Sequence, residues 1–407
     1  MRAAFRERYG RDAAVVVRAP GRVNLIGEHT DYSGLPVLPI AIERATWIAA
    51  APLEQPRLEA FSTGEREAVA LTRSEPRAHG GWGRYLAGAL QEFTPAAPGC
   101  GVSLFVDSDL PASGGLSSSS ALTLGVLSAI NACWDGGLTP EDLVARAAVA
   151  ERHVGVETGG MDQTVIAFAT EGHALRIDFQ PPSHRAIALP AGLAFVVANS
   201  GEAAPKGGAA RDAYNERVIG ARLAAALLTD QVGLDIPLRP ALGDLVDLDV
   251  VDVLADDLPD KISPQEVAHG VDANVENLVA LTAGRYDPRL KVRVKGTARH
   301  ILAEAARVNE AEVALLAGEL AAFGALLNAS HDSLRNDLRC STPALDKVCA
   351  AMRKAGAYGA RLTGAGFGGF ALAAVPPERV AAVIAAAEAA TGGPAFEVHA
   401  SGGLSLL

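Results

Sequence analysis

A glycine- and serine-rich segment at residues 113–120 joins two segments of very different character. Residues 101–107 before it alternate between apolar and polar in the manner of a half-buried strand, and residues 121–134 after it are apolar enough for a buried helix. This order places backbone amides and hydroxyls at a helix N-terminus, where they can bind a phosphate group. No Gly-Lys-Ser/Thr follows, so the segment is not a Walker loop. A flexible linker is the alternative interpretation.

A second group of polar residues lies at 21–32, around a short apolar stretch at 23–26 that has the pattern of a strand. The side chains that could contact a ligand are those of Arg22, Glu28, His29, Asp31 and Tyr32. Carboxylates accept hydrogen bonds from vicinal hydroxyls, histidine donates or accepts, and arginine stabilises developing negative charge. The group therefore predicts a site for a polyhydroxylated ligand, against the alternative of a strand end and turn with solvated charges.

Two further carboxylates, Glu151 and Asp162, stand eleven residues apart with three glycines between them. The glycines make one continuous helix improbable. We therefore expect Glu151 near the end of a helix over 140–154, opened by Thr139 as N-cap, and Asp162 at the start of the next helix. Taken alone, Asp162 could simply cap that helix, and Glu151 could be an exposed helix charge.

The remaining pattern predicts an alternation of helices and strands. Helices are expected at 1–9, 209–230, 299–327, 343–354 and 377–390, and strands at 13–17, 37–51, 193–198, 371–375 and 396–399. Pro20-Gly21 predicts a turn, and the acidic stretch 233–262 is interpreted as a solvated, variable segment. Two consecutive prolines at 181 and 182 favour a boundary between domains at 1–182 and 183–407.

Composition narrows the possible partners. The chain has 407 residues, enough for two domains with full cores, and a formal net charge of −11. A nucleic-acid surface needs clustered Lys and Arg, so none is expected, and no apolar run is long enough to predict a membrane span. The four cysteines form no C-x-x-C pair, which favours reduced thiols. The charged first residues lack the apolar region of a secretory signal, so we expect a cytoplasmic protein.

Residues 21–32 closely resemble the galactokinase signature, within the family of galactokinases, homoserine kinases, mevalonate kinases and phosphomevalonate kinases (the GHMP kinases). Residues 110–121 resemble the second motif of this family, Pro-x-Gly-x-Gly-Leu-Ser-Ser-Ser-Ala, with Ser113 in place of its first Gly and Ser120 in place of Ala. Before the Met-Asp-Gln that contains Asp162, the chain has Thr-Gly-Gly instead of Cys-Gly-Ile. Weaker resemblances lie at 82–85, 214–217, 330–334 and 362–369.

The resemblance implies an α+β fold with two domains, mixed sheets with helices, and an active site in the cleft between the domains. It implies ATP-dependent phosphorylation of the C1 hydroxyl of galactose, giving α-D-galactose 1-phosphate, with Mg²⁺ as cofactor. The implied catalytic residues are Arg22 and Asp162. The implied sugar-binding residues are Arg22, Glu28, His29, Asp31, Gly159, Asp162 and Tyr214. The implied nucleotide-binding residues are Trp82, Ser113, Gly114, Gly115, Leu116, Ser117, Ser118 and Ser119, and the implied metal ligands are Ser119 and Glu151.

Three alternatives stay open at this point. Another sugar-1-kinase of the family, acting on galacturonate, arabinose or N-acetylgalactosamine, would need only a few exchanges in the sugar pocket. A catalytically silent sensor of sugar and ATP would keep the fold and lose catalytic groups, whereas Arg22, Glu151 and Asp162 are all present. A dehydrogenase based on the glycines at 362–369 lacks the strand, loop and acidic residue of a dinucleotide site. The expected partners are a small sugar and ATP, with the chain as a monomer or weak homodimer.

Overall fold

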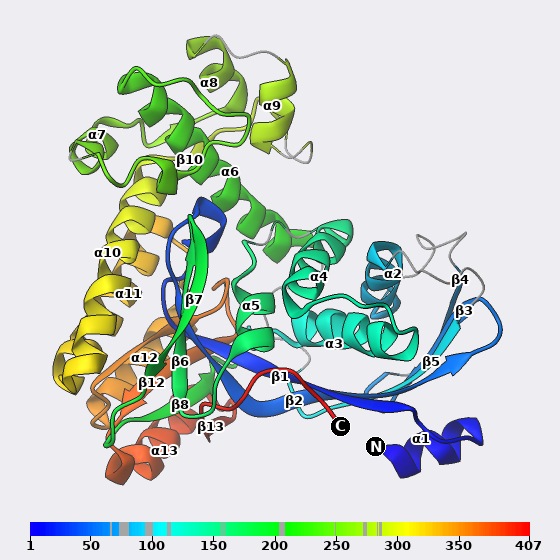
Figure 1. The fold of residues 1–407 in the computed structure, drawn as a ribbon. Helices are drawn as coiled ribbons and strands as arrows, with labels where there is room; N and C mark the ends of the chain where they lie inside the picture. The colour runs from blue at the N-terminus through cyan, green and yellow to red at the C-terminus, as the bar shows by residue number, and fades with distance from the viewer. Residues whose placement is uncertain are drawn as a thin grey trace. The chain divides into compact units, whose positions relative to one another are not determined.

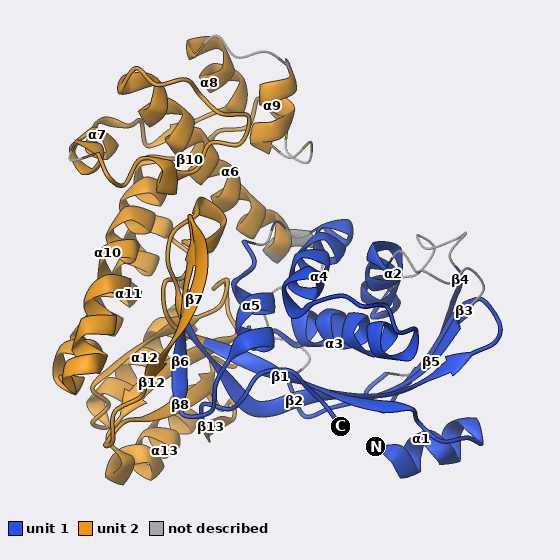
Figure 2. Ribbon diagram, in the orientation of Figure 1, with its two compact units in different colours: residues 1–23, 39–175, 399–407 blue, residues 24–38, 176–398 orange. Residues whose placement is uncertain are grey.

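The computed structural model describes residues 1–65, 67–72, 81–93, 101–111, 115–155, 157, 159–202, 208–248, 250–271, 275–282, 284 and 287–407. Contacts divide the chain into two compact units, which Figure 2 shows in different colours. Unit 1 contains residues 1–23, 39–175 and 399–407, and unit 2 contains residues 24–38 and 176–398. The chain first passes from one unit to the other inside a single strand, after Val23. The division into domains at residues 182 and 183 stays a prediction.

Unit 1 is built on a six-stranded sheet in the order β14-β1-β2-β5-β3-β4. Its strands are β1 (Val15–Ile26), β2 (Leu38–Leu53), β3 (Arg57–Ser62), β4 (Val69–Thr72), β5 (Gly101–Ser108) and β14 (Ser405–Leu406). Most neighbours are antiparallel, but β3 runs parallel to β5. The sheet is therefore mixed, as the family resemblance implies.

The helices of unit 1 cover both faces of this sheet. They are α1 (Arg2–Tyr9), α2 (Gly83–Glu92), α3 (Ser118–Cys133), α4 (Pro140–Val154) and α5 (Met161–Phe168). Figure 1 shows α2, α3 and α4 together over one face. Gly125 of α3 approaches Ile48 of β2, whereas Phe5 of α1 shares a core cluster with Ala49 and Ala51. Because side chains alternate along a strand, α1 and α3 cover opposite faces.

Unit 2 contains an antiparallel four-stranded sheet in the order β11-β12-β8-β13. Its strands are β8 (Ala194–Asn199), β11 (Gly359–Thr363), β12 (Phe370–Val375) and β13 (Ala395–Val398). The helices α12 (Pro343–Lys354) and α13 (Val380–Thr391) share one core cluster with it, to which Ala360 and Leu362 of β11 contribute. A hairpin of β6 (His173–Phe179) and β7 (Pro182–Ala188) forms a separate two-stranded sheet.

A second core of unit 2 is mainly helical. Its elements are α6 (Gly208–Gln231), α7 (Val251–Asp257), α8 (Pro264–Gly270), α9 (Val275–Thr282) and α10 (Lys295–Ala317), with the short strands β9 (Lys261–Ile262) and β10 (Val292–Arg293). The helix α11 (Leu320–Ser333) packs against α10 and against β11 of the four-stranded sheet. Single helical turns lie at η1 (Asp31–Ser33), η2 (Leu242–Asp244), η3 (Leu334–Leu338) and η4 (Pro377–Arg379). In the described part of the chain, no helix combines the length and apolar character needed to cross a bilayer.

Several expected elements are confirmed with their ends. The helix predicted at 140–154 is α4, and Thr139 caps it by accepting a hydrogen bond from the Asp142 amide at 3.2 Å, while Asp142 accepts one from the Thr139 amide at 3.1 Å. The helix predicted at 343–354 is α12, with Thr342 as N-cap. In both cases the signal is local, a threonine followed by proline and a carboxylate within the first turn.

The turn predicted at Pro20-Gly21 is wrong, because β1 runs straight through both residues. A Cβ on Gly21 would lie 2.3 Å from Leu110 Cδ2 and 2.9 Å from the Leu116 carbonyl oxygen. The absence of a side chain at Gly21 thus allows a close approach between β1 and the segment after β5. The φ of Gly21 does not lie in the left-handed region that a tight turn often requires.

Two other expectations need correction. The acidic stretch 233–262 contains η2, α7 and β9, and Val251, Ala255 and Leu258 are buried in the helical core. Their spacing of three to four residues gives the stretch a buried helical face, while the aspartates lie mainly on the other side. The helix predicted at 299–327 is two helices, because α10 ends at Gly318, whose φ of 71° is left-handed.

Candidate active site

Arg22 and Asp162 form a bidentate ion pair in unit 1, which we call the fork. Arg22 lies on β1 and Asp162 is the second residue of α5. The Arg22 Nε donates to Asp162 Oδ1 at 2.7 Å, and Nη2 donates to Oδ2 at 2.8 Å. The two side chains are 7% and 20% exposed. A bidentate pair of this kind fixes both groups in position.

The segment 115–117 holds Arg22 from its other side. The Arg22 Nη1 donates to the Gly115 carbonyl oxygen, and the Arg22 amide donates to the Leu116 carbonyl oxygen at 3.2 Å. The close approach at Gly21 makes these contacts possible. The predicted phosphate segment and the predicted catalytic pair are therefore parts of one packed arrangement. Ser113 and Gly114 lie outside the described residues, so their predicted role stays a prediction.

Ser117 adopts a left-handed conformation, with φ of 59°, at the N-cap of α3. Its hydroxyl does not cap the helix but donates to Asp162 Oδ2, and the Ser120 hydroxyl lies 3.5 Å from the same oxygen. A non-glycine residue in this conformation is held there by its surroundings, and such strain is common at functional sites. Ser118 and Ser119 are half-buried in the first turn of α3, where free backbone amides favour an anion.

Glu151 is a buried carboxylate on α4, 6% exposed. Burial, together with the nearby Asp162 charge, raises its pKa to about 7, while the polar side chains of Ser120 and Gln163 act in the opposite direction. Its Oε1 has no hydrogen-bond partner among the described residues. A buried carboxylate oxygen without a donor is a suitable ligand for a divalent cation, which would favour its ionised form.

The described residues contain no group of three or more His, Cys, Asp or Glu side chains that could hold a metal ion. Mg²⁺ does not need such a cage, because it is usually bound through one or two carboxylates together with substrate phosphates and waters. Glu151 with its unpartnered oxygen fits this kind of site.

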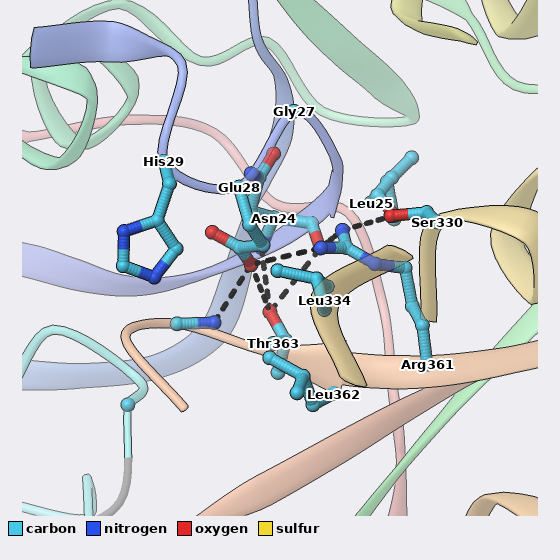
Figure 3. Close-up of polar contacts among 12 residues, drawn as sticks. Asn24, Leu25, Gly27, Glu28, His29, Ser330, Leu334, Arg361, Leu362 and Thr363 are labelled. Carbon is cyan, nitrogen blue, oxygen red and sulfur yellow. Dashed lines mark hydrogen bonds and ion pairs between the residues drawn. The ribbon is translucent and has the colours of Figure 1, made fainter. Parts of the chain in front are cut away.

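Glu28 in unit 2 follows the end of β1 and a glycine in left-handed conformation, Gly27, with φ of 103°. Figure 3 shows its carboxylate directed toward β11 and the loop after it. Oε1 accepts hydrogen bonds from the Gly364 amide at 2.7 Å and from the Thr363 hydroxyl at 3.2 Å. From α10, His300 Nε2 lies 3.0 Å from the Glu28 carbonyl oxygen. The residue is thus held at both its main chain and its side chain.

His29 is also in left-handed conformation, with φ of 67°. Burial and the nearby His300 lower its pKa to about 3, so the ring is neutral at pH 7. Nε2 lies 3.2 Å from the Ala365 carbonyl oxygen, which can only accept, so Nε2 carries the proton. Nδ1 then accepts from the Tyr32 hydroxyl at 3.0 Å. The histidine is a fixed, neutral polar group.

The two tyrosines near His29 form an aromatic cluster with it. Tyr214 of α6 has its ring centroid 5.4 Å from that of His29 and 5.8 Å from that of Tyr32, with the two tyrosine rings edge to face. Asp31 begins η1 and accepts a hydrogen bond from the Tyr32 amide at 2.9 Å. Unit 2 thus brings together four residues of the predicted sugar site, namely Glu28, His29, Asp31 and Tyr214.

Gly159, predicted to contact the sugar, and Trp82, predicted to contact the adenine, both lie in unit 1. Gly159 is half-buried just before α5. Trp82 is the N-cap residue of α2 and half-exposed, and its Nε1 donates to the Glu67 carbonyl oxygen at 3.3 Å. No described contact links Trp82 to the Arg22–Asp162 pair, so its predicted role at adenine stays a prediction.

Sequence reasoning missed several residues of these clusters. Ser120 was noted only as a departure from the family motif, yet its hydroxyl lies beside both Asp162 and Glu151. The residues after β11 that hold Glu28 and His29 were seen as a glycine-rich segment without individual roles. A run of four serines before an apolar helix was the one signal for Ser120.

Comparison with family models gives three matches along the chain. A model described as the galactokinase galactose-binding signature matches residues 3–52. The GHMP kinases N-terminal domain matches residues 84–170, and the GHMP kinases C-terminal model matches residues 311–392. The first match contains the residues around Arg22 and Glu28, and the second contains Glu151 and Asp162.

Curated relatives match over nearly the full chain. A galactokinase from Chloroflexus aurantiacus is 36% identical over 392 residues, covering 94% of this chain and 90% of the relative. A galactokinase from Canis lupus familiaris is 32% identical, covering 90% and 85%. Among solved structures, Lactococcus lactis galactokinase complexed with galactose has a TM-score of 0.78 at 28% identity, covering 99% of this chain and 98% of that one. A mevalonate kinase, at 18% identity and a TM-score of 0.56 over 95% and 99% of the two chains, shares the fold.

Proposed function

Since this chain belongs to the galactokinase family, we propose that it transfers the γ-phosphoryl group of ATP to the C1 hydroxyl of galactose, giving α-D-galactose 1-phosphate. The observation that carries this proposal is the buried fork between Arg22 and Asp162, next to the N-terminus of α3. It supplies an oriented carboxylate and a cation at one place. That the chain acts as a monomer or weak homodimer in the cytoplasm stays a prediction.

Phosphoryl transfer depends on positioning and on neutralising charge more than on covalent help from the protein. The amides of the first turn of α3 and the segment 115–119 would bind the phosphates of ATP. We assign Gly115, Leu116 and Ser117–Ser119 to this task, together with the predicted Ser113 and Gly114. Trp82 would stack on the adenine, since an aromatic face suits a base.

Asp162 is the candidate general base for the sugar hydroxyl. Two hydrogen bonds from Arg22 hold its carboxylate in one orientation. Arg22 would in addition stabilise the negative charge on the reacting oxygens. In a second version of this mechanism Arg22 contributes most of the rate enhancement, and Asp162 mainly orients the hydroxyl.

Mg²⁺ is the cofactor that we propose for the reaction, with Ser119 and Glu151 as its protein ligands. The unpartnered Oε1 of Glu151 supports this assignment. When bound, the ion would neutralise charge on the phosphate oxygens. The chain's own contribution is a carboxylate kept out of water, with Ser120 beside it.

The sugar would be recognised by Glu28, His29, Asp31, Gly159 and Tyr214, with Arg22 and Asp162 at its C1 hydroxyl. Carboxylates accept hydrogen bonds from neighbouring hydroxyls, and the neutral, fixed ring of His29 adds a polar contact without adding charge. Tyr214 supplies an aromatic wall. Sites that hydrogen-bond a hydroxyl reject analogues that lack it, because the buried polar group is then left unpaired.

The test is the release of ADP from Mg²⁺-ATP with a panel of sugars that includes galactose, galacturonate, arabinose and N-acetylgalactosamine. Turnover that depends on galactose, and that D162A lacks, is expected. Turnover with another sugar alone would reassign the substrate while keeping the reaction. Binding of galactose and ATP without any turnover would overturn the proposed activity in favour of a sensor.

A further inference from the structure

Arg217 is a buried arginine of α6 that joins this helix to two other segments of unit 2. Its side chain is 9% exposed. Nε donates to the Leu338 carbonyl oxygen at 2.9 Å, and Nη2 donates to the Arg339 carbonyl oxygen at 3.1 Å. These oxygens lie at the C-terminal end of η3, where main-chain carbonyls lack partners within the helix and favour a cation. The arginine therefore ties α6 to the end of η3.

The same guanidinium lies over the ring of Phe367, with Cζ of Arg217 5.3 Å from the ring centroid. A cation in this position is attracted by the face of an aromatic ring. Phe367 belongs to the loop 364–369 after β11, and its φ of 61° is left-handed, which is unusual for a bulky residue. Its amide donates to the Cys340 carbonyl oxygen at 2.6 Å. Phe367 is thus held at its main chain by Cys340 and contacted at its ring by Arg217.

The start of this loop contacts two residues of the predicted sugar site. The Gly364 amide donates to Glu28 Oε1 at 2.7 Å, and the Ala365 carbonyl oxygen accepts from His29 Nε2 at 3.2 Å. A single residue separates Ala365 from Phe367. A displacement of the Phe367 ring would therefore be transmitted to the main-chain atoms that Glu28 and His29 contact.

Tyr214 connects the other side of Arg217 to the same site. The two residues are three positions apart on α6, so their side chains leave the helix on the same side. The ring centroid of Tyr214 lies 5.4 Å from that of His29. By binding the loop from α6, Arg217 sets the position of the helix that contains Tyr214 relative to the loop that contacts His29.

We propose that Arg217 is a positioning residue for sugar recognition, which together with Phe367 forms a clamp between α6 and the loop 364–369. This inference rests on the proposed function, in which Glu28, His29 and Tyr214 contact the sugar. The clamp itself touches no reacting group. Its described contacts lie in unit 2, whereas the Arg22–Asp162 fork lies in unit 1. Loss of the clamp should therefore weaken the binding of galactose more than that of ATP.

The experiment measures the galactose Kd by calorimetry without nucleotide, and kcat and both KM values from ADP release, for wild type, R217Q, R217K and F367L. R217Q loses the cation and the forked contact to two carbonyls, so the Kd and KM for galactose should rise at least about tenfold. The KM for ATP and kcat should stay within about twofold of wild type, as expected when ground-state binding of the sugar is lost. R217K keeps the charge without the planar fork and should lie in between. F367L removes the ring and should raise the Kd about threefold or more.

Sugar selectivity provides a readout that a loss of stability does not change. A site that hydrogen-bonds a hydroxyl rejects the analogue that lacks it, because a buried polar group is left unpaired. If the loop moves, Glu28 and His29 read their hydroxyls less strictly. The ratio of kcat/KM for galactose to that for a deoxygalactose should therefore fall in R217Q for at least one position of the missing hydroxyl. A smaller fraction of folded enzyme would lower both values equally and leave every ratio unchanged.

R176Q is the matched control. Arg176 also lies in unit 2 with a side chain that is 9% exposed, and it pairs with Asp178 and Glu312. R176Q should lower the urea midpoint of unfolding, as R217Q does, and leave the galactose Kd and the deoxygalactose ratios at their wild-type values. In the F367L background, R217Q should raise the Kd by a smaller factor than in the wild type, because the two side chains act through one contact.

Three results would overturn the inference. The first is a wild-type galactose Kd in R217Q. The second is an R176Q variant that raises this Kd as much as R217Q does, and the third is a pair of effects in R217Q and F367L that combine additively. If R217Q does not fold, R217K and F367L carry the test, and a wild-type Kd in both would overturn the inference. Failure of the wild type to bind galactose would overturn the proposed function itself, so the two failures are distinguishable.

Discussion

Replacing Asp162 by asparagine tests the Arg22–Asp162 fork most directly. In the wild type each carboxylate oxygen accepts one hydrogen bond from Arg22, at 2.7 Å and 2.8 Å. Asparagine has one oxygen and one NH₂ group, so one of these two bonds becomes a contact between two donors. The Ser117 hydroxyl, which donates to Oδ2, can rotate and accept a hydrogen bond if an NH₂ group takes that position. The substitution therefore removes a charge and at least one hydrogen bond while keeping the shape of the side chain.

The size of the effect follows from burial. Breaking a buried ion pair by removing one partner costs about 3–5 kcal/mol of stability. Asp162 is 20% exposed and Arg22 7% exposed, so part of the Arg22 charge can be rehydrated. We therefore expect a loss at or just below the lower end of this range, about 2–3 kcal/mol. For turnover, loss of a general base typically lowers kcat by about 10²–10⁴-fold, which corresponds to about 3–5 kcal/mol in the barrier.

The assay compares D162N with D162A in three measurements: kcat with galactose and ATP, ATP affinity by calorimetry, and the urea midpoint of unfolding. Both variants should lose at least about 10²-fold in kcat and unfold at lower urea, with ATP affinity close to wild type. Clearly higher activity in D162N than in D162A would favour the version centred on Arg22, in which the side chain orients the hydroxyl. Near-normal kcat in both would refute a role of Asp162 in the chemistry, and an unchanged midpoint would refute the energetic reasoning.

Three further predictions concern unit 1. The pKa of Glu151 is raised to about 7 by burial, so Mg²⁺ affinity measured by calorimetry should increase from about pH 6 to about pH 8 as the carboxyl ionises, and a flat profile would contradict this. S120A removes a hydroxyl that lowers this pKa and should shift the same profile to higher pH, whereas an identical profile would show that Ser120 does not act on Glu151. In G21A the new Cβ would lie 2.3 Å from Leu110 Cδ2 and 2.9 Å from the Leu116 carbonyl oxygen. We therefore expect the free energy of unfolding to fall by about 1–3 kcal/mol and the KM for ATP to rise. Wild-type stability of G21A in urea unfolding would rule out the steric explanation.

The sequence was sufficient to predict a helix and its ends wherever the capping residues lie next to each other in the chain. For α4, the order Thr139, Pro140, Glu141, Asp142 contains the N-cap, the first-turn proline and the reciprocal hydrogen bond of a capping box. For α12, Thr342 and Pro343 form a similar start, and both ends of the helix lie where they were expected. The fold class and the order of the functional motifs came from resemblance, which depends on the residues of each motif and not on their contacts.

The sequence was insufficient where a residue's role depends on a distant partner. Pro20-Gly21 has the composition of a turn, and only the packing of Leu110 and Leu116 against β1 explains why the chain stays extended there. Arg22 and Asp162 are 140 residues apart, and no spacing rule indicates that they form a fork. In the same way, nothing in the sequence around Arg361 predicts that this arginine is fully buried.

The geometry of the fork also limits which oxygen of Asp162 can receive a proton. Oδ2 accepts hydrogen bonds from Arg22 Nη2 and the Ser117 hydroxyl, and the Ser120 hydroxyl lies 3.5 Å away. An ionised carboxylate oxygen has two lone pairs, so Oδ2 is already saturated. Oδ1 accepts one bond, from Arg22 Nε. A substrate hydroxyl must therefore approach Oδ1, or Ser117 must first turn its hydroxyl away, and Ser117 belongs to the segment that we assign to the phosphates. Proton acceptance at Oδ2 would then require a phosphate or another acceptor to attract the Ser117 hydroxyl, whereas acceptance at Oδ1 would leave Ser117 in place. S117A should raise the KM for ATP in either case, because Ser117 is assigned to the phosphates, but at saturating ATP it should change kcat strongly only if Oδ2 is the acceptor.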